Sequence, residues 1–198
     1  MDEDRECGRP SLADERGVES VYQPAEDSAL LARAAREAVE PGMRALDVGT
    51  GSGYVAAELA EAGADAVGVD LSPLACRQAR QNGVQTVRGD LVAPFQSLSF
   101  DLVVFNPPYL PTPSETEWDD WMEHALSGGE DGRRLVDPFL SSVGRVLETD
   151  GEVLLLVSSL TDPDAVLAFG GEHGLDGERL VSEKHPYEEL VVLRFSQT

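Results

Sequence analysis

The chain has 198 residues, which is enough for one domain with a substantial buried core and short for two. Apolar residues make up 41% and charged residues 26%, as is typical of a soluble globular protein. The longest strongly apolar run, 153–157, is far shorter than the roughly 20 residues of a membrane span. No basic segment precedes an apolar stretch at the N-terminus, so we expect neither a membrane protein nor a secreted one.

Cysteine and histidine usage argues against disulfide bonds and bound metal. Cys7 and Cys76 are too few for a disulfide framework, and they lack the spacing of metal ligands. The three histidines are also scattered along the chain without ligand spacing. We therefore expect a protein of the reducing cytoplasm that holds no metal.

The formal net charge of −22 is the most unusual property of the composition. Such a charge argues against nucleic-acid binding, because attraction to phosphates needs clustered lysine and arginine. Lys184 is the only lysine, and this acidity keeps a protein soluble at molar salt, where the Debye length falls to about 3 Å. We therefore infer a salt-loving source. At the high salt concentration of such a source, the net charge does not indicate which partners the protein binds.

Helices and strands are predicted to alternate after a flexible acidic arm over 1–20. The expected helices cover 26–40, 54–62, 73–82, 138–147 and 163–169, and the expected strands cover 45–48, 66–69, 84–88, 102–105, 152–157, 176–183 and 188–195. Short connections between them predict an α/β domain over 21–198, with a mostly parallel sheet covered by helices on both faces. The last two strands are joined without a helix, so one of them is expected to be antiparallel.

Four polar residues lie at the carboxyl ends of successive predicted strands, the first within its strand and the other three after theirs. They are Asp47, Asp70, Asp90 and Asn106. An aspartate after a strand is most often a turn residue, but four in register at the carboxyl ends of parallel strands indicate a ligand site.

The glycine-rich segment 49–53 allows two interpretations. A dinucleotide site would need a glycine where Tyr54 stands, and Asp47 would repel a pyrophosphate at the helix N-terminus. A ligand with an ammonium and a sulfonium group, such as S-adenosylmethionine, instead tolerates an acidic rim. Its ribose hydroxyls suit Asp70, and its adenine suits the carboxylate of Asp90 and the apolar side chain of Leu91.

The tetrapeptide Asn106-Pro107-Pro108-Tyr109 is the sharpest local feature. Its two prolines make the loop rigid before any substrate arrives. The side-chain oxygen of Asn106 and a backbone carbonyl can accept hydrogen bonds from a planar NH₂ group, and Tyr109 can stack on its face. This pattern predicts methyl transfer to an amide or exocyclic amine nitrogen, with no strong general base.

These motifs together resemble the class I S-adenosylmethionine-dependent methyltransferases, and within them the HemK-type protein-glutamine methyltransferases. The resemblance extends from Val21 to about Phe195 and rests on the segments 21–28, 47–53, 106–109 and 128–133. The first segment resembles that of the short archaeal and eukaryotic branch, which together with the acidity implies a halophilic archaeon. The resemblance implies a seven-stranded, Rossmann-like methyltransferase sheet with an antiparallel last strand.

The family's functional residues can be carried onto this chain position by position. The implied catalytic residues are Asn106, Pro107, Pro108 and Tyr109. The implied cofactor contacts are Ser28, Asp47, Gly49, Thr50, Gly51, Gly53, Asp70, Asp90, Leu91 and Asn106. Many relatives have glutamate where Asp47 stands, a departure that keeps the charge and shortens its reach.

The resemblance also implies a substrate and a partner. The branch methylates the glutamine of the Gly-Gly-Gln motif in class I translation release factors. It commonly works as a heterodimer with a small zinc-binding activator subunit, which pairs with an edge strand of the sheet. Residues 84–88 would be that edge strand here.

Two other functions stay open from the sequence. An adenine-N6 methyltransferase acting on DNA or RNA would fit the same tetrapeptide, although such enzymes usually need a basic channel or a recognition domain. A non-catalytic cofactor-binding scaffold subunit is the second alternative, and the intact tetrapeptide argues against it.

Trp118 and Trp121 are expected either to cover the substrate pocket or to anchor the loop.

Overall fold

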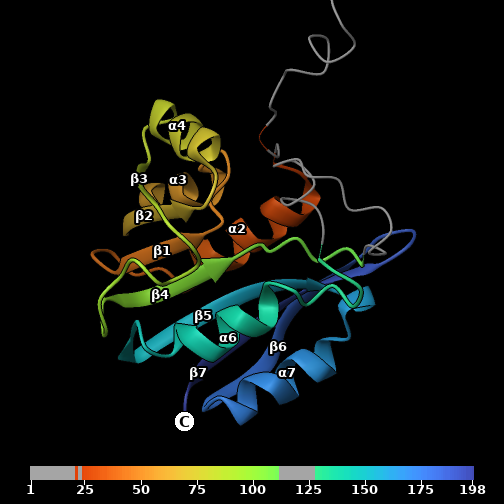
Figure 1. The fold of residues 1–198 in the computed structure, drawn as a ribbon. Coiled ribbons are helices and arrows are strands. Elements are labelled where there is room, and N and C mark those ends of the chain that lie inside the picture. Colours follow the sequence, from red (N-terminus) through yellow and green to blue (C-terminus); the bar gives the residue numbers. More distant parts are fainter. Residues whose placement is uncertain (1–20, 22–23, 112–127) are drawn as a thin grey trace, which may run out of the picture.

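The computed structural model describes residues 21, 24–111 and 128–198 (Figure 1). The predicted arm over 1–20 lies outside the described residues, as do Trp118 and Trp121. The described part of the chain folds around one seven-stranded sheet with the order β3-β2-β1-β4-β5-β7-β6. Its strands are β1 (Arg44–Val48), β2 (Asp65–Asp70), β3 (Gln85–Arg88), β4 (Phe100–Phe105), β5 (Leu147–Ser158), β6 (Leu175–Lys184) and β7 (Glu189–Gln197).

The direction of the strands confirms the predicted mixed sheet. Neighbouring strands from β3 to β5 pair in parallel, whereas β7 runs antiparallel to both β5 and β6. The chain leaves β3 at one edge and returns to β4 on the far side of β1, so strand order reverses between β1 and β4. In open α/β sheets this switch point forms a crevice at the carboxyl ends of the strands.

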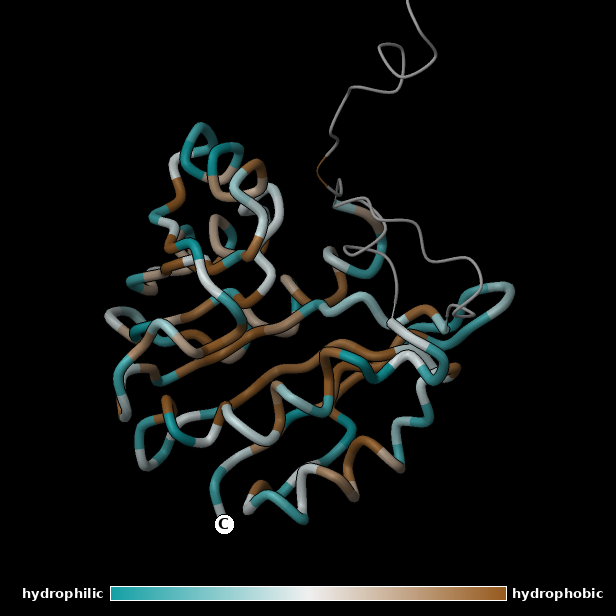
Figure 2. The backbone as a smooth tube through the Cα atoms, in the orientation of Figure 1, coloured by the Kyte–Doolittle hydropathy of each residue, from teal (hydrophilic) through white to brown (hydrophobic). Residues whose placement is uncertain are grey.

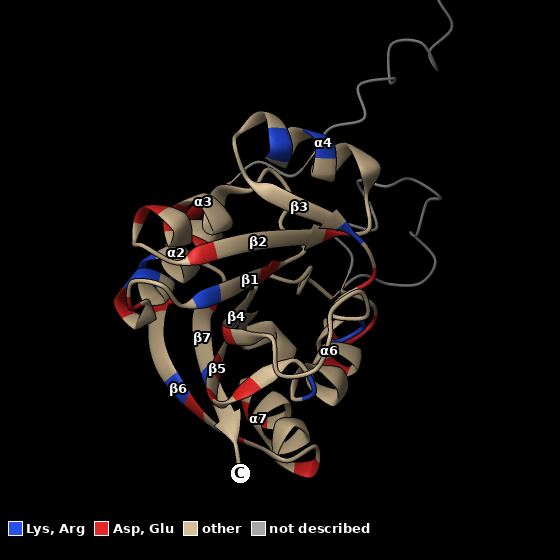
Figure 3. Cartoon of the chain, turned by 90° about the vertical axis from the view of Figure 1, so that its left-hand side faces the viewer, with Lys and Arg blue, Asp and Glu red and all other residues tan. Residues whose placement is uncertain are grey.

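Helices cover both faces of the sheet. They are α2 (Glu26–Ala38), α3 (Tyr54–Glu61), α4 (Pro73–Gln81), α6 (Val136–Val143) and α7 (Pro163–Glu172), with a short 3₁₀ turn η2 (Ser159–Thr161). Helices α2 and α3 share one buried cluster with the sheet, and α6 and α7 share another on the opposite face (Figure 3). The central strands are accordingly the most hydrophobic part of the chain (Figure 2).

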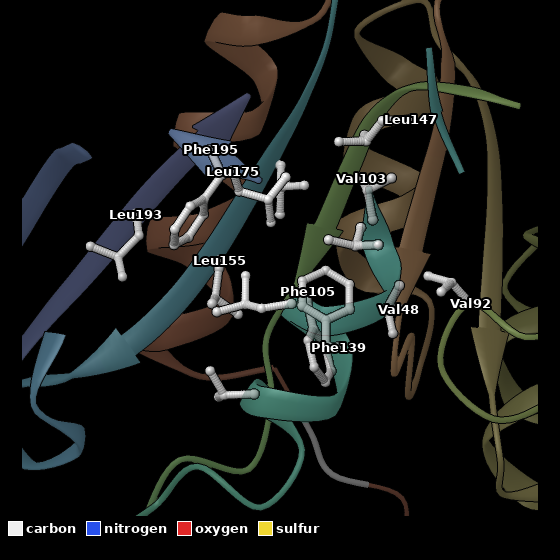
Figure 4. Packing of buried hydrophobic residues seen from close by; sticks show 14 of the residues in the cluster. Val48, Val92, Val103, Phe105, Phe139, Leu147, Leu155, Leu175, Leu193 and Phe195 are labelled. Carbon is white, nitrogen blue, oxygen red and sulfur yellow. The ribbon is translucent and has the colours of Figure 1, made fainter. Parts of the chain in front are cut away.

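Strand β4 is buried on both faces, as its apolar sequence predicts. Phe105 at its end packs against Phe139 of α6 with ring centroids 4.8 Å apart (Figure 4). Full burial of one such side chain stabilises the fold by roughly 1.5–3 kcal/mol. This packing fixes the last residue of β4 and therefore the direction in which the following loop leaves the sheet.

Several predicted boundaries were wrong, and the largest error is the strand expected over 152–157, which begins at Leu147 and ends at Ser158. The helix expected to reach Leu147 ends at Val143, because Gly144 caps it, residues 144–146 form a turn, and Leu147 is already the first residue of β5. The first helix ends at Ala38 instead of residue 40, since Pro41 disfavours helical geometry in the residue before it. Helix α7 continues to Glu172, three residues further than predicted.

The helices of the described residues are all too short or too polar to cross a membrane.

Candidate functional site

The carboxyl ends of four parallel strands bring the predicted polar residues to one edge of the sheet. Val48 of β1 pairs with Val69 of β2 on one side and with Phe105 of β4 on the other. The residues that follow these three, Gly49, Asp70 and Asn106, therefore lie side by side in strand order. Asp90 follows β3 in the same way.

The turn between β1 and α3 depends on three glycines in left-handed conformation. Gly49, Gly51 and Gly53 have φ values of +62°, +55° and +85°, which other residues adopt only with strain. The Thr50 amide donates to the carbonyl of Val69 at 3.0 Å, and the Gly53 amide donates to the carbonyl of Thr50 at 2.7 Å. The backbone is thus held tightly over the ends of β1 and β2, as a loop that cradles a ligand requires.

Asp47 lies beneath this turn and is only 3% exposed. Its Oδ2 accepts a hydrogen bond from Thr50 Oγ1 at 2.7 Å and another from the Ala56 amide at 3.1 Å. Burial raises the pKa of Asp47 to about 7, and the nearby charge of Asp70 contributes in the same direction. A cation placed beside this carboxylate would favour its charged form, so the position suits a positively charged ligand.

Asp70 ends β2 and holds the glycine turn from the other side. Its Oδ2 accepts from the Gly51 amide at 3.0 Å, and its Oδ1 accepts from the Ser72 amide at 2.8 Å. Burial raises the pKa of this carboxyl group as well. Each carboxylate oxygen can accept more than one hydrogen bond, so Asp70 keeps capacity for ligand hydroxyl groups.

The positions of Asp90 and Leu91 follow from a backbone bond of the neighbouring Gly89. The amide of Gly89 donates to the carbonyl of Asp70 at 3.0 Å, which ties the start of this turn to β2. The Asp90 side chain is exposed, and Leu91 is partly buried against the core with a φ of +44°. The structure therefore puts this pair at the predicted edge of the sheet, beside Asp70.

Asn106 stands in a hydrogen-bond network that reaches across the chain to α2. Its Nδ2 donates to Asp27 Oδ2 at 3.2 Å and to Ser28 Oγ at 3.3 Å. Its Oδ1 is shielded from water and has no hydrogen-bond partner among the residues that the structure describes. An unpaired buried acceptor costs roughly 1–3 kcal/mol, which an incoming donor would recover.

The same network includes Tyr109, whose hydroxyl donates to Asp27 Oδ2 at 3.4 Å. Ser28, which was predicted as a cofactor contact, meets the tetrapeptide directly through its bond with Asn106. Sequence reasoning missed Asp27 as a functional residue. It belongs to the recognised segment 21–28, but an acidic residue in the first turn of a helix is common and gives no signal of its own.

The segment that follows Gly128 supports the tetrapeptide from behind. The Gly128 amide donates to the carbonyl of Leu110 at 3.0 Å, and Thr161 Oγ1 donates to the carbonyl of Tyr109 at 3.4 Å. A side chain on Gly132 would overlap the same Tyr109 carbonyl. Arg133 pairs with Asp131, with Nη2 to Oδ2 at 3.1 Å.

The site therefore combines two chemical regions. Buried carboxylates and a glycine turn at β1 and β2 suit a cationic ligand with hydroxyl groups. At the end of β4, the buried amide oxygen of Asn106, which has no partner among the described residues, suits a planar NH₂ donor. Within the described ranges, no group of three or more histidine, cysteine or acidic side chains could hold a metal ion.

Comparison with known proteins gives consistent matches. A model of the methyltransferase domain family matches residues 46–107. The chain is 34% identical over 182 residues to a candidate protein N5-glutamine methyltransferase of Methanocaldococcus jannaschii, which covers 87% of this chain and 90% of that protein. It is 36% identical over 193 residues to methyltransferase HEMK2 of Homo sapiens, which covers 90% of each.

A solved structure agrees with these matches. The structure of the E. cuniculi Mtq2-Trm112 complex, described as responsible for the methylation of the eRF1 translation termination factor, has a TM-score of 0.76 and 31% identity. The match covers 90% of this chain and 99% of that one.

Proposed function

The chain belongs to the family of protein N5-glutamine methyltransferases, and from that premise we propose that it methylates the glutamine of the Gly-Gly-Gln motif in the class I translation release factor, with S-adenosylmethionine as the methyl donor. The described action of the E. cuniculi complex on a translation termination factor supports this substrate. A substrate of translation also implies a cytoplasmic enzyme.

The observation that carries the proposal is the buried Oδ1 of Asn106, which accepts no hydrogen bond from the part of the chain that the structure describes. A primary amide offers two N–H donors in one plane, and a buried acceptor without a partner among the described residues is the complement of such a donor. Pro107 and Pro108 restrict the backbone around this acceptor, so little conformational freedom is lost when the substrate binds.

Methyl transfer to an amide nitrogen depends more on the position of this nitrogen than on its activation by a general base. When bound, S-adenosylmethionine supplies an electrophilic methyl group: the amide nitrogen bonds to the methyl carbon, the carbon–sulfur bond breaks, sulfur keeps the electron pair, and the nitrogen loses a proton to water. Asn106 holds the nitrogen through one N–H, and Tyr109 limits its rotation by packing on the amide plane. Correct alignment of this kind can contribute several kcal/mol, roughly 7–11 at most.

The residues at β1, β2 and β3 fit the proposed donor. Asp47 offers a buried negative charge beneath the glycine turn, Asp70 keeps acceptor capacity for the ribose hydroxyls, and Asp90 with Leu91 suits the adenine. We assign the glycine turn, through Gly49, Thr50, Gly51 and Gly53, to close approach of the backbone to the donor.

A small zinc-binding activator subunit is the proposed partner. The structure of the E. cuniculi complex supports a two-protein assembly, and β3 offers the exposed edge that β-augmentation needs. This edge strand covers 85–88, one residue shorter than predicted. The two exposed arginines of α4, which packs beside β3, make the surface of this helix locally basic and favour an acidic partner surface (Figure 3).

Labelled methyl transfer tests the proposed function. The full chain, alone and with the activator subunit of its source, is incubated with methyl-labelled S-adenosylmethionine and either the release factor or adenine-containing DNA and RNA. We expect label in the release factor alone. Label in nucleic acid would replace the proposal with adenine methylation, and cofactor binding without transfer to any acceptor would favour a scaffold subunit.

A further inference from the structure

The carboxylate of Asp27 contacts both ends of the tetrapeptide. This residue lies in the first turn of α2, is 5% exposed, and is separated from Asn106 by 79 positions in the sequence. Its Oδ2 accepts from Asn106 Nδ2 and from the Tyr109 hydroxyl. A carboxylate at the start of a helix is also stabilised by the helix dipole.

The carboxylate decides which way the amide of Asn106 points. The two ends of an asparagine amide have nearly the same shape, so packing alone does not distinguish its nitrogen from its oxygen. Because an ionised carboxylate has only acceptor atoms, it can face the nitrogen of Asn106 but not the oxygen. The oxygen must then point away from Asp27.

Ser28 reinforces the same choice. Its hydroxyl donates to Asp27 Oδ1 at 3.3 Å and is therefore an acceptor toward Asn106 Nδ2. Its backbone amide donates to the same Asp27 oxygen at 2.6 Å. Oδ1 of Asp27 thus accepts hydrogen bonds from Ser28 within α2, and Oδ2 accepts hydrogen bonds from the tetrapeptide.

We infer that Asp27 is a positioning residue that fixes the orientation of the Asn106 amide, so that Oδ1 and not Nδ2 meets the substrate nitrogen. This inference rests on the proposed function, because it assigns the residue a role in glutamine methylation. It also explains why Oδ1 of Asn106 is buried without a partner among the described residues. Asp27 holds Nδ2, so the Asn106 amide cannot rotate to bring Oδ1 to another donor.

The substitution Asp27→Asn tests this role because it keeps the shape and removes one acceptor. The side chain of an asparagine has one acceptor oxygen, so at position 27 it cannot accept both from the Ser28 amide and from residue 106. The direction of the Ser28 backbone N–H is fixed by α2, so the oxygen must face this N–H. The amide nitrogen of residue 27 must therefore face residue 106, where it would repel the NH₂ group of Asn106. We expect Asn106 to reverse and present a donor to the substrate.

Methyl transfer by the full chain to a Gly-Gly-Gln peptide is measured for the unaltered protein first, since its activity tests the proposed function independently of any variant. For Asp27→Asn we expect kcat to fall about 100-fold, with S-adenosylmethionine affinity and the thermal midpoint close to those of the unaltered chain. Glu26→Gln, which removes the neighbouring carboxylate of the same helical turn, is the matched control and should leave kcat unchanged.

A double exchange separates positioning from a merely structural role. In Asp27→Asn with Asn106→Asp, the new amide can donate to the new carboxylate, whose second oxygen again accepts from the substrate. We expect this double variant to be at least about tenfold more active than either single variant. Activity at or below that of the weaker single variant, or an unchanged kcat for Asp27→Asn, would overturn the inference.

Discussion

Gly132 lies directly against the backbone carbonyl of Tyr109, and a Cβ atom at this glycine would overlap that oxygen. Its φ of +75° is in the left-handed region, so the position is restricted both by space and by backbone conformation. The glycine-rich segment 128–133 and the tetrapeptide therefore act as one packed unit, although they are distant in sequence.

Gly132→Ala should damage both the fold and the site. We expect a loss of roughly 1–3 kcal/mol from backbone strain, plus a displacement of Tyr109 that lowers methyl transfer. Gly83→Ala is the control, because Gly83 has a φ of +87° and open space around its Cβ position. Denaturant unfolding and activity are measured for both. Equal effects of the two substitutions would mean that contact with Tyr109 is unimportant.

Asn106→Ala should abolish methyl transfer and leave S-adenosylmethionine affinity largely intact. The substitution removes the acceptor for the substrate amide, which we expect to lower kcat by about 100-fold or more. Calorimetry measures cofactor binding and single-turnover transfer measures the chemical step. If both were lost together, Asn106 would shape the pocket and would not orient the nitrogen.

Asp70→Ala should weaken cofactor binding before it affects turnover. It removes the acceptor proposed for the ribose and also the bond that holds the Gly51 amide, so we expect the dissociation constant to rise about tenfold or more. Asp65→Ala, at the exposed opposite end of β2, provides the matched control. An unchanged affinity for Asp70→Ala would remove this residue from the cofactor site.

Asp47 should make the free energy of unfolding depend on pH. Its pKa rises from 3.8 in the unfolded chain to about 7 in the fold, so between these values the folded state holds more protons. The stabilising contribution is complete below about pH 3.8 and is lost as the pH rises through about 7. Asp47→Asn can keep the bonds from Thr50 and Ala56 and stays neutral at every pH.

We therefore expect Asp47→Asn to be more stable than the unaltered chain above pH 7, by roughly 2–4 kcal/mol, with the difference shrinking as the pH falls toward 4. The same variant should bind S-adenosylmethionine more weakly, because it lacks the negative charge. Chemical unfolding across this pH range measures the first effect. A stability difference that does not change with pH would show that burial of Asp47 is not responsible.

The sequence predicts those parts of the site that follow from strand order. Asp47 lies one residue before the end of β1, Asp70 ends β2, and Asn106 follows β4, so the carboxyl edge of a parallel sheet brings them together whatever the details of packing. The short connection between the last two strands predicted that one of them is antiparallel, and the family resemblance implied that it is the last strand, β7, as the structure confirms.

Contacts between distant segments could not be predicted from the sequence. The bond between Asp27 and Asn106 depends on how α2 lies across the end of β4, and an acidic residue in a first helical turn gives no indication of it. The end of α6 was mispredicted because Val146 and Leu147 are buried in either a helix or a strand, and their apolar character does not distinguish the two.

Tandem mass spectrometry of the release factor after incubation with the chain, its activator subunit and S-adenosylmethionine is the most direct measurement of the central claim. We predict one added methyl group on the side-chain nitrogen of the glutamine in Gly-Gly-Gln, and none on a factor in which that glutamine is replaced by glutamate. A methyl group on any other residue, or equal modification of the glutamate form, would contradict a site built around the amide acceptor of Asn106.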